Sequence, residues 1–197
     1  MIKVGITGGM GSGKTVVSEL FRLHGVPVFD ADKEAKLLND TSPRVKEGLT
    51  RHFGPGLYEG GRLNRAKLAE LIFKDERNLA VANSIIHPVL AERFILWSQE
   101  REHHPVVVID AAVLFEAKFE RYVDQVITVF SPEEIRVERV KQRDGIDRSG
   151  AMARMQHQVP EEEKIRRADH VIYNDGNHSL IQQVANLLSD LRVTTLD

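Results

Sequence analysis

Short apolar runs alternate along the chain with longer stretches whose apolar residues recur at helical spacing. The apolar runs lie at residues 2–6, 26–29, 106–110, 126–130 and 171–174, and each predicts a strand. The run at 106–110 is continuous, which is typical of a parallel strand that is covered on both faces. Because helical stretches separate the runs, we predict a three-layer α/β fold with a parallel sheet and right-handed crossovers.

The region from Lys33 to about Arg101 departs from this alternation, because its pattern is helical and polar with loop signals at residues 39–43, 54–56 and 60–61. Roughly sixty helical residues between two strands exceed the dozen or so that a crossover needs. We therefore interpret this region as a helical insertion that binds substrate.

Two helix boundaries within the insertion can be predicted from single residues. Asn64 has the side chain and the position of an N-cap. A later helix is expected to stop at His87, because Pro88 disfavours the α conformation in the residue before it. Pro88 would then lie in the first turn of the next helix, where proline is well tolerated.

A basic helix is predicted to follow the strand at 126–130. It would begin at residues 131–134, Ser-Pro-Glu-Glu, as a capping box with proline at the first helical position. Arg136, Arg139 and Arg143 then fall at i, i+3 and i+7, along one helix face. Such a face is often only solvated, but beside a Gly-containing break and a second polar helix it also fits a lid.

The strand at 2–6 leads into a glycine-rich loop, Gly8 to Thr15, that matches the G-x-x-x-x-G-K-[ST] pattern of a phosphate-binding P-loop. Glycines let the backbone approach a phosphate, and the helix that follows adds the positive end of its dipole. Lys14 is expected to reach the β- and γ-phosphates, the Thr15 hydroxyl to hold Mg²⁺, and backbone amides to bind the inner phosphates. The predicted nucleotide-binding residues of the loop are Gly8, Gly11, Ser12, Gly13, Lys14, Thr15 and Val16.

Three acids lie where strands end, and ligands of open parallel sheets bind there. Asp30 and Asp32 follow the strand at 26–29, and their i, i+2 spacing on an extended segment would point both side chains the same way. One of them, Asp32, is our candidate for a base that accepts the proton of an attacking hydroxyl. Asp110 ends the central apolar run and is a candidate for the Mg²⁺ site. For all three acids, capping of the next helix remains the alternative.

Composition narrows the class of protein without identifying it. The 197 residues carry a net charge of -2 and no cysteine, which excludes a disulfide framework and thiolate metal sites. Nothing in the charge suggests a nucleic-acid or membrane partner. The first strand starts at residue 2 and no uninterrupted apolar run is long enough to span a membrane, so we expect a cytoplasmic protein.

With these motifs the chain resembles the dephospho-coenzyme A kinase family, and the resemblance extends over nearly the whole chain. The P-loop alone is shared with many proteins, but further motifs occur in the family's order. Ala112 departs from the pattern, because it stands where the family usually has proline, which puts the rigidity of that loop in question. The motifs are Thr7–Thr15, Asp30–Asp32, Phe53-Gly54, Leu63–Arg65, His87-Pro88, Asp110–Glu116, Arg139–Gly145, and the stretch from Lys164 through Ala168-Asp169, Val171-Ile172 and Asn174 to Gly176.

The resemblance implies transfer of the ATP γ-phosphoryl group, with Mg²⁺, to the ribose 3′-hydroxyl of dephospho-coenzyme A. It implies that Asp32 is the general base and that Lys14 and Arg143 stabilise the transferring charge. Further residues are then expected to bind the nucleotide (Arg139, Asn174, Gly176), the acceptor (Asp32, His87, Leu114, Phe115) and the metal (Thr15, Asp110). The implied parts are a P-loop kinase core at residues 1–32, 104–135 and 168–197, a coenzyme-binding insertion at 33–103 and a lid at 136–167.

Two other functions compete with this one. A GTP-binding switch would need a guanine-reading N-K-x-D stretch, and the sequence has none; the D-x-x-G at residues 147–150 lacks a preceding apolar strand. A kinase for a nucleoside monophosphate or another small hydroxyl compound is the nearer rival, although the long insertion favours a large acceptor. His87 before proline is more often structural than functional. The sequence predicts a monomer or a small homo-oligomer.

Overall fold

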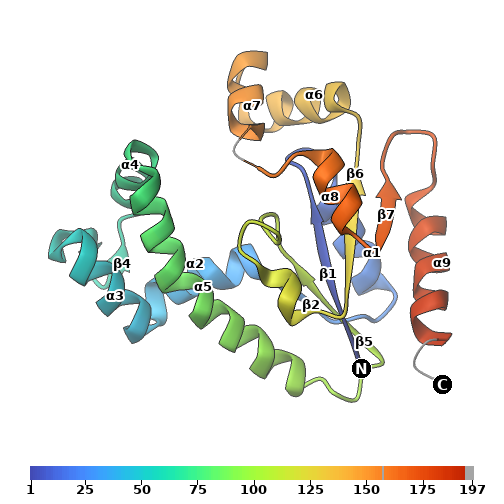
Figure 1. Ribbon diagram of the computed structural model, residues 1–197, viewed down its shortest axis with the longest axis horizontal. Coiled ribbons are helices and arrows are strands. Elements are labelled where there is room, and N and C mark those ends of the chain that lie inside the picture. Colours follow the sequence, from blue (N-terminus) through green and yellow to red (C-terminus); the bar gives the residue numbers. More distant parts are fainter. Residues whose placement is uncertain (157, 194–197) are drawn as a thin grey trace. The chain divides into compact units, whose positions relative to one another are not determined.

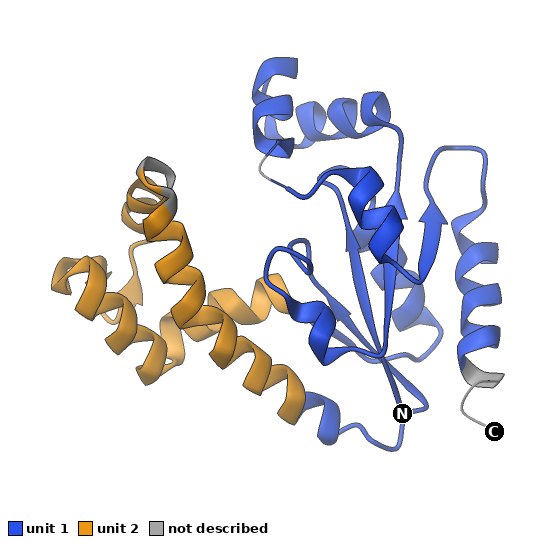
Figure 2. Ribbon diagram, viewed as in Figure 1, with its two compact units in different colours: residues 1–30, 97–197 blue, residues 31–96 orange. Residues whose placement is uncertain are grey.

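The computed structural model describes residues 1–156 and 158–193, and it divides into two compact units. Unit 1 comprises residues Met1–Asp30 and Trp97–Asp197, and unit 2 comprises Ala31–Leu96 (Figure 2). Each unit has its own hydrophobic core. We describe each unit by itself.

Unit 1 is built on a five-stranded parallel sheet in the order β2-β5-β1-β6-β7 (Figure 1). The strands are β1 (Ile2–Gly8), β2 (Val28–Asp30), β5 (Val106–Asp110), β6 (Gln125–Phe130) and β7 (His170–Tyr173). Every neighbouring pair is parallel, as the alternation of strand and helix predicted. The α/β fold class is therefore confirmed, with β1 at the centre of the sheet.

Helices flank this sheet. They are α1 (Lys14–Leu23), α6 (Glu133–Asp144), α7 (Arg148–Met155), α8 (Glu161–Arg167) and α9 (Leu180–Val193), with a 3₁₀ turn at Phe119–Tyr122. Apolar residues of α1 and α9 pack with β1, β5 and β6 in one core that includes Phe21, Val184 and Ile127. A smaller cluster joins α6 to α7 through Val137, Val140 and Ala151.

The predicted start of α6 is wrong by one residue. The N-cap is Pro132, which makes no side-chain capping bond, so the expected capping box between Ser131 and Glu134 does not form. Ser131 is buried instead, and its backbone carbonyl accepts a hydrogen bond from Arg136 Nε at 3.0 Å. The Ser131 hydroxyl accepts from Arg139 NH1 at 3.4 Å and makes no capping bond to the helix.

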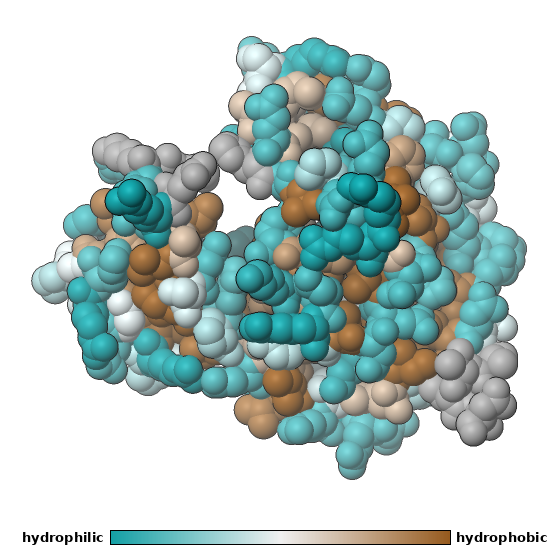
Figure 3. Space-filling model, viewed as in Figure 1, coloured by the Kyte–Doolittle hydropathy of each residue, from teal (hydrophilic) through white to brown (hydrophobic). Residues whose placement is uncertain are grey.

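Unit 2 is mainly helical, with α2 (Ala31–Thr41), α3 (Pro43–Phe53), α4 (Arg65–Lys74) and most of α5 (Glu76–Gln99). Asn64 caps α4 as predicted, since its side chain accepts from the Lys67 amide at 3.0 Å. After a 3₁₀ turn at Pro55–Leu57, the strands β3 (Tyr58–Glu59) and β4 (Arg62–Leu63) form an antiparallel hairpin that the sequence analysis did not predict. On the face drawn in Figure 3, hydrophilic side chains cover much of each unit.

The expected helix break at His87 does not occur, because α5 continues through Pro88. A proline inside a helix removes one backbone hydrogen bond. Ile85, Ile86 and Val89 on both sides of it pack against the same core of unit 2, and this packing compensates for the lost bond.

A part of α5, Arg77–Gln99, is long and apolar enough to cross a membrane by length and composition alone. This differs from the expectation that no such segment exists. One such helix is weak evidence for a membrane span, because core helices of globular proteins pass the same test. Ala82, Leu90 and Phe94 of this helix are buried, but only 22% of its apolar window is buried inside the protein.

Candidate active site

The P-loop joins the carboxyl end of the central strand β1 to the first turn of α1. Gly11 and Gly13 adopt positive φ values of 81° and 93°. A Cβ atom at Gly13 would collide with the side-chain amide of Asn174, and one at Gly11 would lie 2.5 Å from the Arg136 carbonyl oxygen. Conformation and crowding therefore both require glycine at these two positions. Gly8 and the buried Ser12 complete the loop; a Cβ at Gly8 would meet Ser12 Oγ and the Val129 carbonyl oxygen.

Backbone amides at the start of α1 are the predicted phosphate donors. The first amides of an α-helix have no acceptor within the helix, which leaves those of Lys14 and Thr15 suited to an anion. The Val16 amide differs, because it donates to the Gly13 carbonyl at 2.9 Å. It would have to share or leave that acceptor in order to reach a phosphate.

Lys14 forms an ion pair with Asp110. The contact follows from the sheet, since β1 and β5 are neighbours and Asp110 is paired in register with Ile6. The side chains of Lys14 and Asp110 are 14% and 8% exposed, so the pair lies at the edge of the interior. The structure thus brings together two residues that the sequence placed at the phosphates and at the metal.

The oxygen donors near the loop suit Mg²⁺. The Asp110 carboxylate and the hydroxyl of the exposed Thr15 are hard oxygen ligands of the kind that this ion prefers. The described residues contain no group of three or more His, Cys, Asp or Glu that could hold a metal by themselves. Mg²⁺ commonly takes its remaining ligands from water and nucleotide phosphates, so a Thr and an Asp are a fitting donor set.

Arg139 and Asn174 reach the P-loop from two different elements. Arg139 NH1 of α6 donates to the carbonyl oxygens of Gly11 at 3.2 Å and Ser12 at 3.4 Å. Asn174, just after β7, donates to the Ser12 oxygen at 2.7 Å, and its own carbonyl oxygen accepts from Arg139 at 3.4 Å. These contacts place both predicted nucleotide-binding residues against the back of the loop. Gly176 lies two residues further on, exposed and at φ 87°.

Arg143 lies in the last turn of α6, where it forms an ion pair. Its guanidinium donates to both carboxylate oxygens of Asp144, at 2.7 and 3.0 Å, and Arg154 of α7 also pairs with Asp144 at 2.7 Å. Hydrogen bonds from Arg143 hold the pKa of Asp144 below its usual value. The Arg143 side chain is 62% exposed. Of the three arginines along one face of α6, Arg136 and Arg139 contact the P-loop region, whereas Arg143 pairs with Asp144.

Leu114 and Phe115, predicted to touch the acceptor, are buried in unit 1. Leu114 is fully buried and lies against Gly5, while the Phe115 ring packs under the guanidinium of Arg167 at 4.2 Å. Both side chains pack inside unit 1, and their contact with the acceptor stays a prediction.

The two acids after β2 differ from the expected geometry. Asp30 ends β2 in register with Asp110, whereas Asp32 lies in the first turn of α2 and is exposed. The prediction that both extend from a strand, with side chains pointing the same way, is therefore wrong, because the helix begins at Ala31. Helical residues two apart point in different directions.

His87 lies within α5 and is half-buried. Burial lowers the pKa of this histidine, so it is neutral at pH 7. A neutral imidazole offers one hydrogen-bond donor and one acceptor. This property suits a structural role and a contact with a polar substrate group alike.

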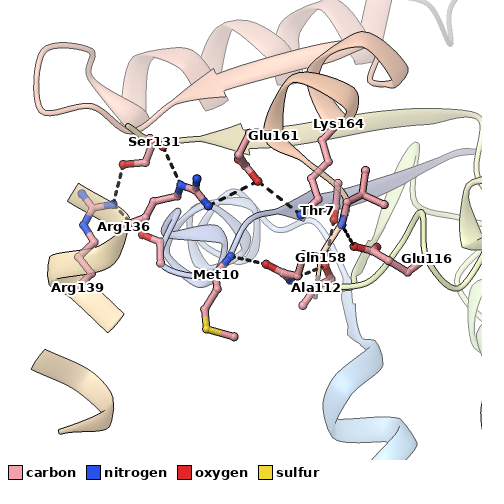
Figure 4. Close-up of polar contacts among 12 residues, drawn as sticks. Thr7, Met10, Ala112, Glu116, Ser131, Arg136, Arg139, Gln158, Glu161 and Lys164 are labelled. Carbon is pink, nitrogen blue, oxygen red and sulfur yellow. Dashed lines mark hydrogen bonds and ion pairs between the residues drawn. The ribbon is translucent and has the colours of Figure 1, made fainter. Parts of the chain in front are cut away.

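A set of polar contacts behind the P-loop was missed by the sequence analysis (Figure 4). Gln158 bonds both the Met10 amide at 2.8 Å and the Ala112 carbonyl at 3.4 Å. Glu161 of α8 lies 3.8 Å from Arg136 and 3.5 Å from the fully buried Lys164. In the sequence, Met10, Ala112, Arg136 and Lys164 lie in motifs noted above, whereas Gln158 and Glu161 carried no such signal.

These elements together define a class of protein. A parallel sheet whose central strand ends in a P-loop, with Lys14 and Asp110 paired beside it and arginines on the helix above, is the core of a P-loop kinase. The comparisons with known proteins agree with this class and then narrow it.

The family model for dephospho-CoA kinase matches residues 2–179. The dephospho-CoA kinase of Porphyromonas gingivalis is 42% identical over 193 residues, which cover 98% of this chain and 95% of the relative. The crystal structure of TT1252 from Thermus thermophilus superposes with a TM-score of 0.83 at 36% identity and covers 96% of this chain and 97% of that one. A dephospho-CoA kinase from Campylobacter jejuni shares the fold at a TM-score of 0.70 and 21% identity, with 98% of each chain covered.

The chain belongs to the dephospho-CoA kinase family. The reaction of this family is the ATP-dependent phosphorylation of dephospho-CoA, the last step of coenzyme A biosynthesis. The resemblance found in the sequence is thereby confirmed.

Proposed function

We propose that this chain transfers the γ-phosphoryl group of ATP to the ribose 3′-hydroxyl of dephospho-CoA. The observation that carries the proposal is the P-loop with the Lys14–Asp110 pair at its mouth, in a chain of this family. In-line transfer of a phosphoryl group needs a cradle for the phosphates, neutralisation of the moving charge and an oriented hydroxyl. Each need has a candidate residue here.

Asp32 is our candidate for the general base. It lies two residues beyond the end of β2, and a base must be in its carboxylate form to accept the hydroxyl proton. Asp32 would hold and orient the acceptor hydroxyl and take its proton as the oxygen attacks the phosphorus.

Lys14 and Arg143 are our candidates for stabilising the charge on the transferring group. Lys14 would turn part of its interaction from Asp110 to the β- and γ-phosphates. Arg143 would exchange the Asp144 carboxylate for phosphate oxygens, which offer the guanidinium the same two-point geometry. Residues 136–167 would then act as the lid, with Arg139 and Arg136 at its fixed base.

Thr15 and Asp110 are the residues that would hold Mg²⁺. When bound, the ion would neutralise charge that develops on the phosphate oxygens. Asp110 already sits in register with the P-loop strand, so the protein supplies this acid at a defined place.

The remaining residue roles divide between nucleotide and acceptor. Asn174 and Gly176 would lie beside the adenine of ATP, since they follow β7 at the same sheet edge as the P-loop. Residues 33–103 would bind the coenzyme, with the neutral His87 as a hydrogen-bonding partner. We further propose that the enzyme acts in the cytoplasm, as a monomer or a small homo-oligomer, without nucleic acid or membrane.

A panel of acceptors tests the proposal. Purified protein with ATP and Mg²⁺ is given dephospho-CoA, several nucleoside monophosphates or shikimate, and ADP release is measured beside product analysis. We expect turnover with dephospho-CoA alone and a phosphate at the ribose 3′ position of the product. Turnover with a nucleoside monophosphate and none with dephospho-CoA would overturn the assignment.

A further inference from the structure

Gln158 joins two segments of the site that lie far apart in sequence. Its side-chain oxygen accepts from the backbone amide of Met10, in the P-loop, at 2.8 Å. Its side-chain nitrogen donates to the carbonyl of Ala112, in the loop after β5, at 3.4 Å. In Figure 4 the Gln158 amide lies between these two backbone groups. One side chain thus spans the gap between the loop that cradles phosphate and the loop that follows Asp110.

The Ala112 carbonyl oxygen accepts hydrogen bonds from two different parts of the site, of which Gln158 is one. It also accepts from Thr7 Oγ1 of β1, at 3.5 Å. Ala112 follows Asp110 by two residues, and Asp110 holds Lys14. A shift of the Ala112 backbone would therefore change where the Lys14–Asp110 pair stands relative to the P-loop.

The segment that carries Gln158 is itself firmly held. The next amide, that of Val159, donates to Glu116 Oε1 at 2.8 Å. Glu161 follows, and one of its carboxylate oxygens lies 3.8 Å from Arg136 and 3.5 Å from the fully buried Lys164. A Cβ atom at Gly9 would collide with this same Glu161 carboxylate, so the segment is packed directly on the P-loop.

We propose that Gln158 is a positioning residue for the kinase reaction: its amide sets the P-loop and the loop after Asp110 at a fixed spacing. This inference rests on the proposed function of the site, and it adds a residue to which no role has been given. Gln158 touches neither Lys14 nor Asp110, and it acts on them through Met10 and Ala112.

The chemistry of the two contacts fits a primary amide. Met10 offers an N–H and Ala112 offers an oxygen, so the side chain must accept at one end and donate at the other. A leucine can do neither. An ionised glutamate of the same shape can accept from Met10 but puts an acceptor against the Ala112 oxygen, whereas a protonated glutamic acid can again do both.

The test uses Gln158→Leu and Gln158→Glu, with Gln156→Leu and Gln156→Glu as matched controls. Gln156 is exposed just after α7, two residues away, and lines the same cavity as Gln158, so its variants control for a change of side chain in these surroundings. At pH 7.5 we expect Gln158→Leu to raise the KM for ATP and to lower kcat, reducing kcat/KM by about 5- to 100-fold, the range given by two net hydrogen bonds. Gln158→Glu should lower kcat mainly, because the Met10 bond remains. The Gln156 variants should stay within about twofold, as surface changes usually do.

A pH profile separates positioning from a general loss of structure. The ratio of kcat/KM for Gln158→Glu to that of the parent should rise as pH falls from about 8 towards about 5.5, because a growing fraction of the new side chain regains its proton. Glu133, Arg136, Glu161 and Glu162 line the same cavity as Gln158. The ratio corrects for these groups because the parent contains the same ones. The ratio should not rise for Gln156→Glu.

A spectroscopic measurement keeps the test independent of the acceptor. The chain has four methionines including the first residue, so ¹⁵N-methionine labelling gives a simple spectrum in which the Met10 amide can be followed. Its proton should move upfield in Gln158→Leu and stay near its place in Gln156→Leu. ATP-analogue binding, measured by calorimetry, should weaken in the first variant only.

The outcomes are distinguishable. An unchanged Met10 signal together with normal analogue binding in a folded Gln158→Leu protein would overturn the positioning role. A flat pH ratio for Gln158→Glu would overturn it as well. If the parent enzyme failed to phosphorylate dephospho-CoA while these variants still altered Met10 and nucleotide binding, the proposed function would fail and the inference about Gln158 would stand.

Discussion

Charged side chains are used differently in the two units. In unit 1, Asp110, Arg136 and Lys164 are buried and pack around the P-loop and the segments that support it. In unit 2, the pairs Arg44–Glu92 and Arg51–Glu47 are exposed on both partners. A buried charge keeps its partners in place, because burying an ion without its partners costs folding free energy. Exposed ion pairs are solvated and contribute little to stability. An exposed charged residue can therefore bind a substrate at little cost in folding stability.

The sharpest test concerns Arg143, an exposed charge of unit 1 that we assign to catalysis. Arg143→Gln should lower kcat by about 10³- to 10⁵-fold, as loss of an arginine at a transferring phosphoryl group does. Arg154→Gln is the matched control, because Arg154 shares the partner Asp144 and is also exposed. Initial rates at saturating ATP measure both. Equal losses in the two variants would mean that Arg143 acts only through the Asp144 cluster.

Asp32 extends the comparison to unit 2. Asp32→Asn should lower turnover by about 10²- to 10⁴-fold, the usual contribution of a positioned base, with ATP binding unchanged. Glu34→Gln removes a second acid from the same first turn of α2, so both variants lose a similar interaction with the helix dipole. Only the first should lose activity. Near-normal turnover of Asp32→Asn would remove Asp32 from the role of base.

The contrast between units also explains what the sequence could predict. Strands of the parallel sheet were predictable, because burial on both faces demands continuous apolar runs such as 106–110. The P-loop was predictable because close approach of a phosphate fixes glycines at set positions. In unit 2, local signals competed with packing. Pro88 signalled a helix end, yet α5 continues because both sides of it share one core.

The rest of the site depends on contacts between distant segments, which leave no periodic pattern. Gln158 is one polar residue between two helices, and nothing local distinguishes it from the exposed Gln156. Arg136 and Arg143 look alike on a helical wheel, but one is buried beside the P-loop and the other pairs with Asp144. Leu114 and Phe115 were assigned to the substrate by resemblance, whereas the structure buries them.

The buried charges of unit 1 give the next prediction. Lys164→Met should destabilise the protein by about 3–5 kcal/mol, because it removes a buried cation that interacts with the Glu116 carboxylate and shares Glu161 with Arg136. Lys141→Met, which removes a lysine from a surface pair with Glu138, should cost at most about 1 kcal/mol. Urea unfolding at pH 7.5 measures both.

The pH dependence of this loss gives a further check. A buried carboxylate that loses a neighbouring cation has a raised pKa, so protonation at about pH 5 should relieve part of the defect in Lys164→Met. A loss that is small, or that does not shrink at low pH, would contradict a structural role for the buried charge.

Substitution of His87 should change the pH dependence of folding stability by a smaller amount and in a known direction. Its pKa is lowered in the folded protein, so the unfolded chain takes up the proton first as pH falls. The contribution of His87 to stability is therefore complete above its unfolded pKa of about 6.5 and is lost progressively as pH drops from there to the folded value. The Tm of His87→Gln should thus fall less steeply between pH 7.5 and 5 than the Tm of the parent. The exposed His52→Gln should follow the parent.

The smallest expected effect tests the exposed pairs of unit 2. Arg44 NH1 donates to both carboxylate oxygens of Glu92, at 2.8 and 2.9 Å, which is good geometry for a surface pair. A double-mutant cycle with Arg44→Gln and Glu92→Gln should nevertheless give a coupling of about 0–1 kcal/mol. Added salt should reduce that coupling further, because exposed charges are screened. A coupling well above this range that resists salt would show that unit 2 also relies on its charges for stability, and the contrast between the two units would be lost.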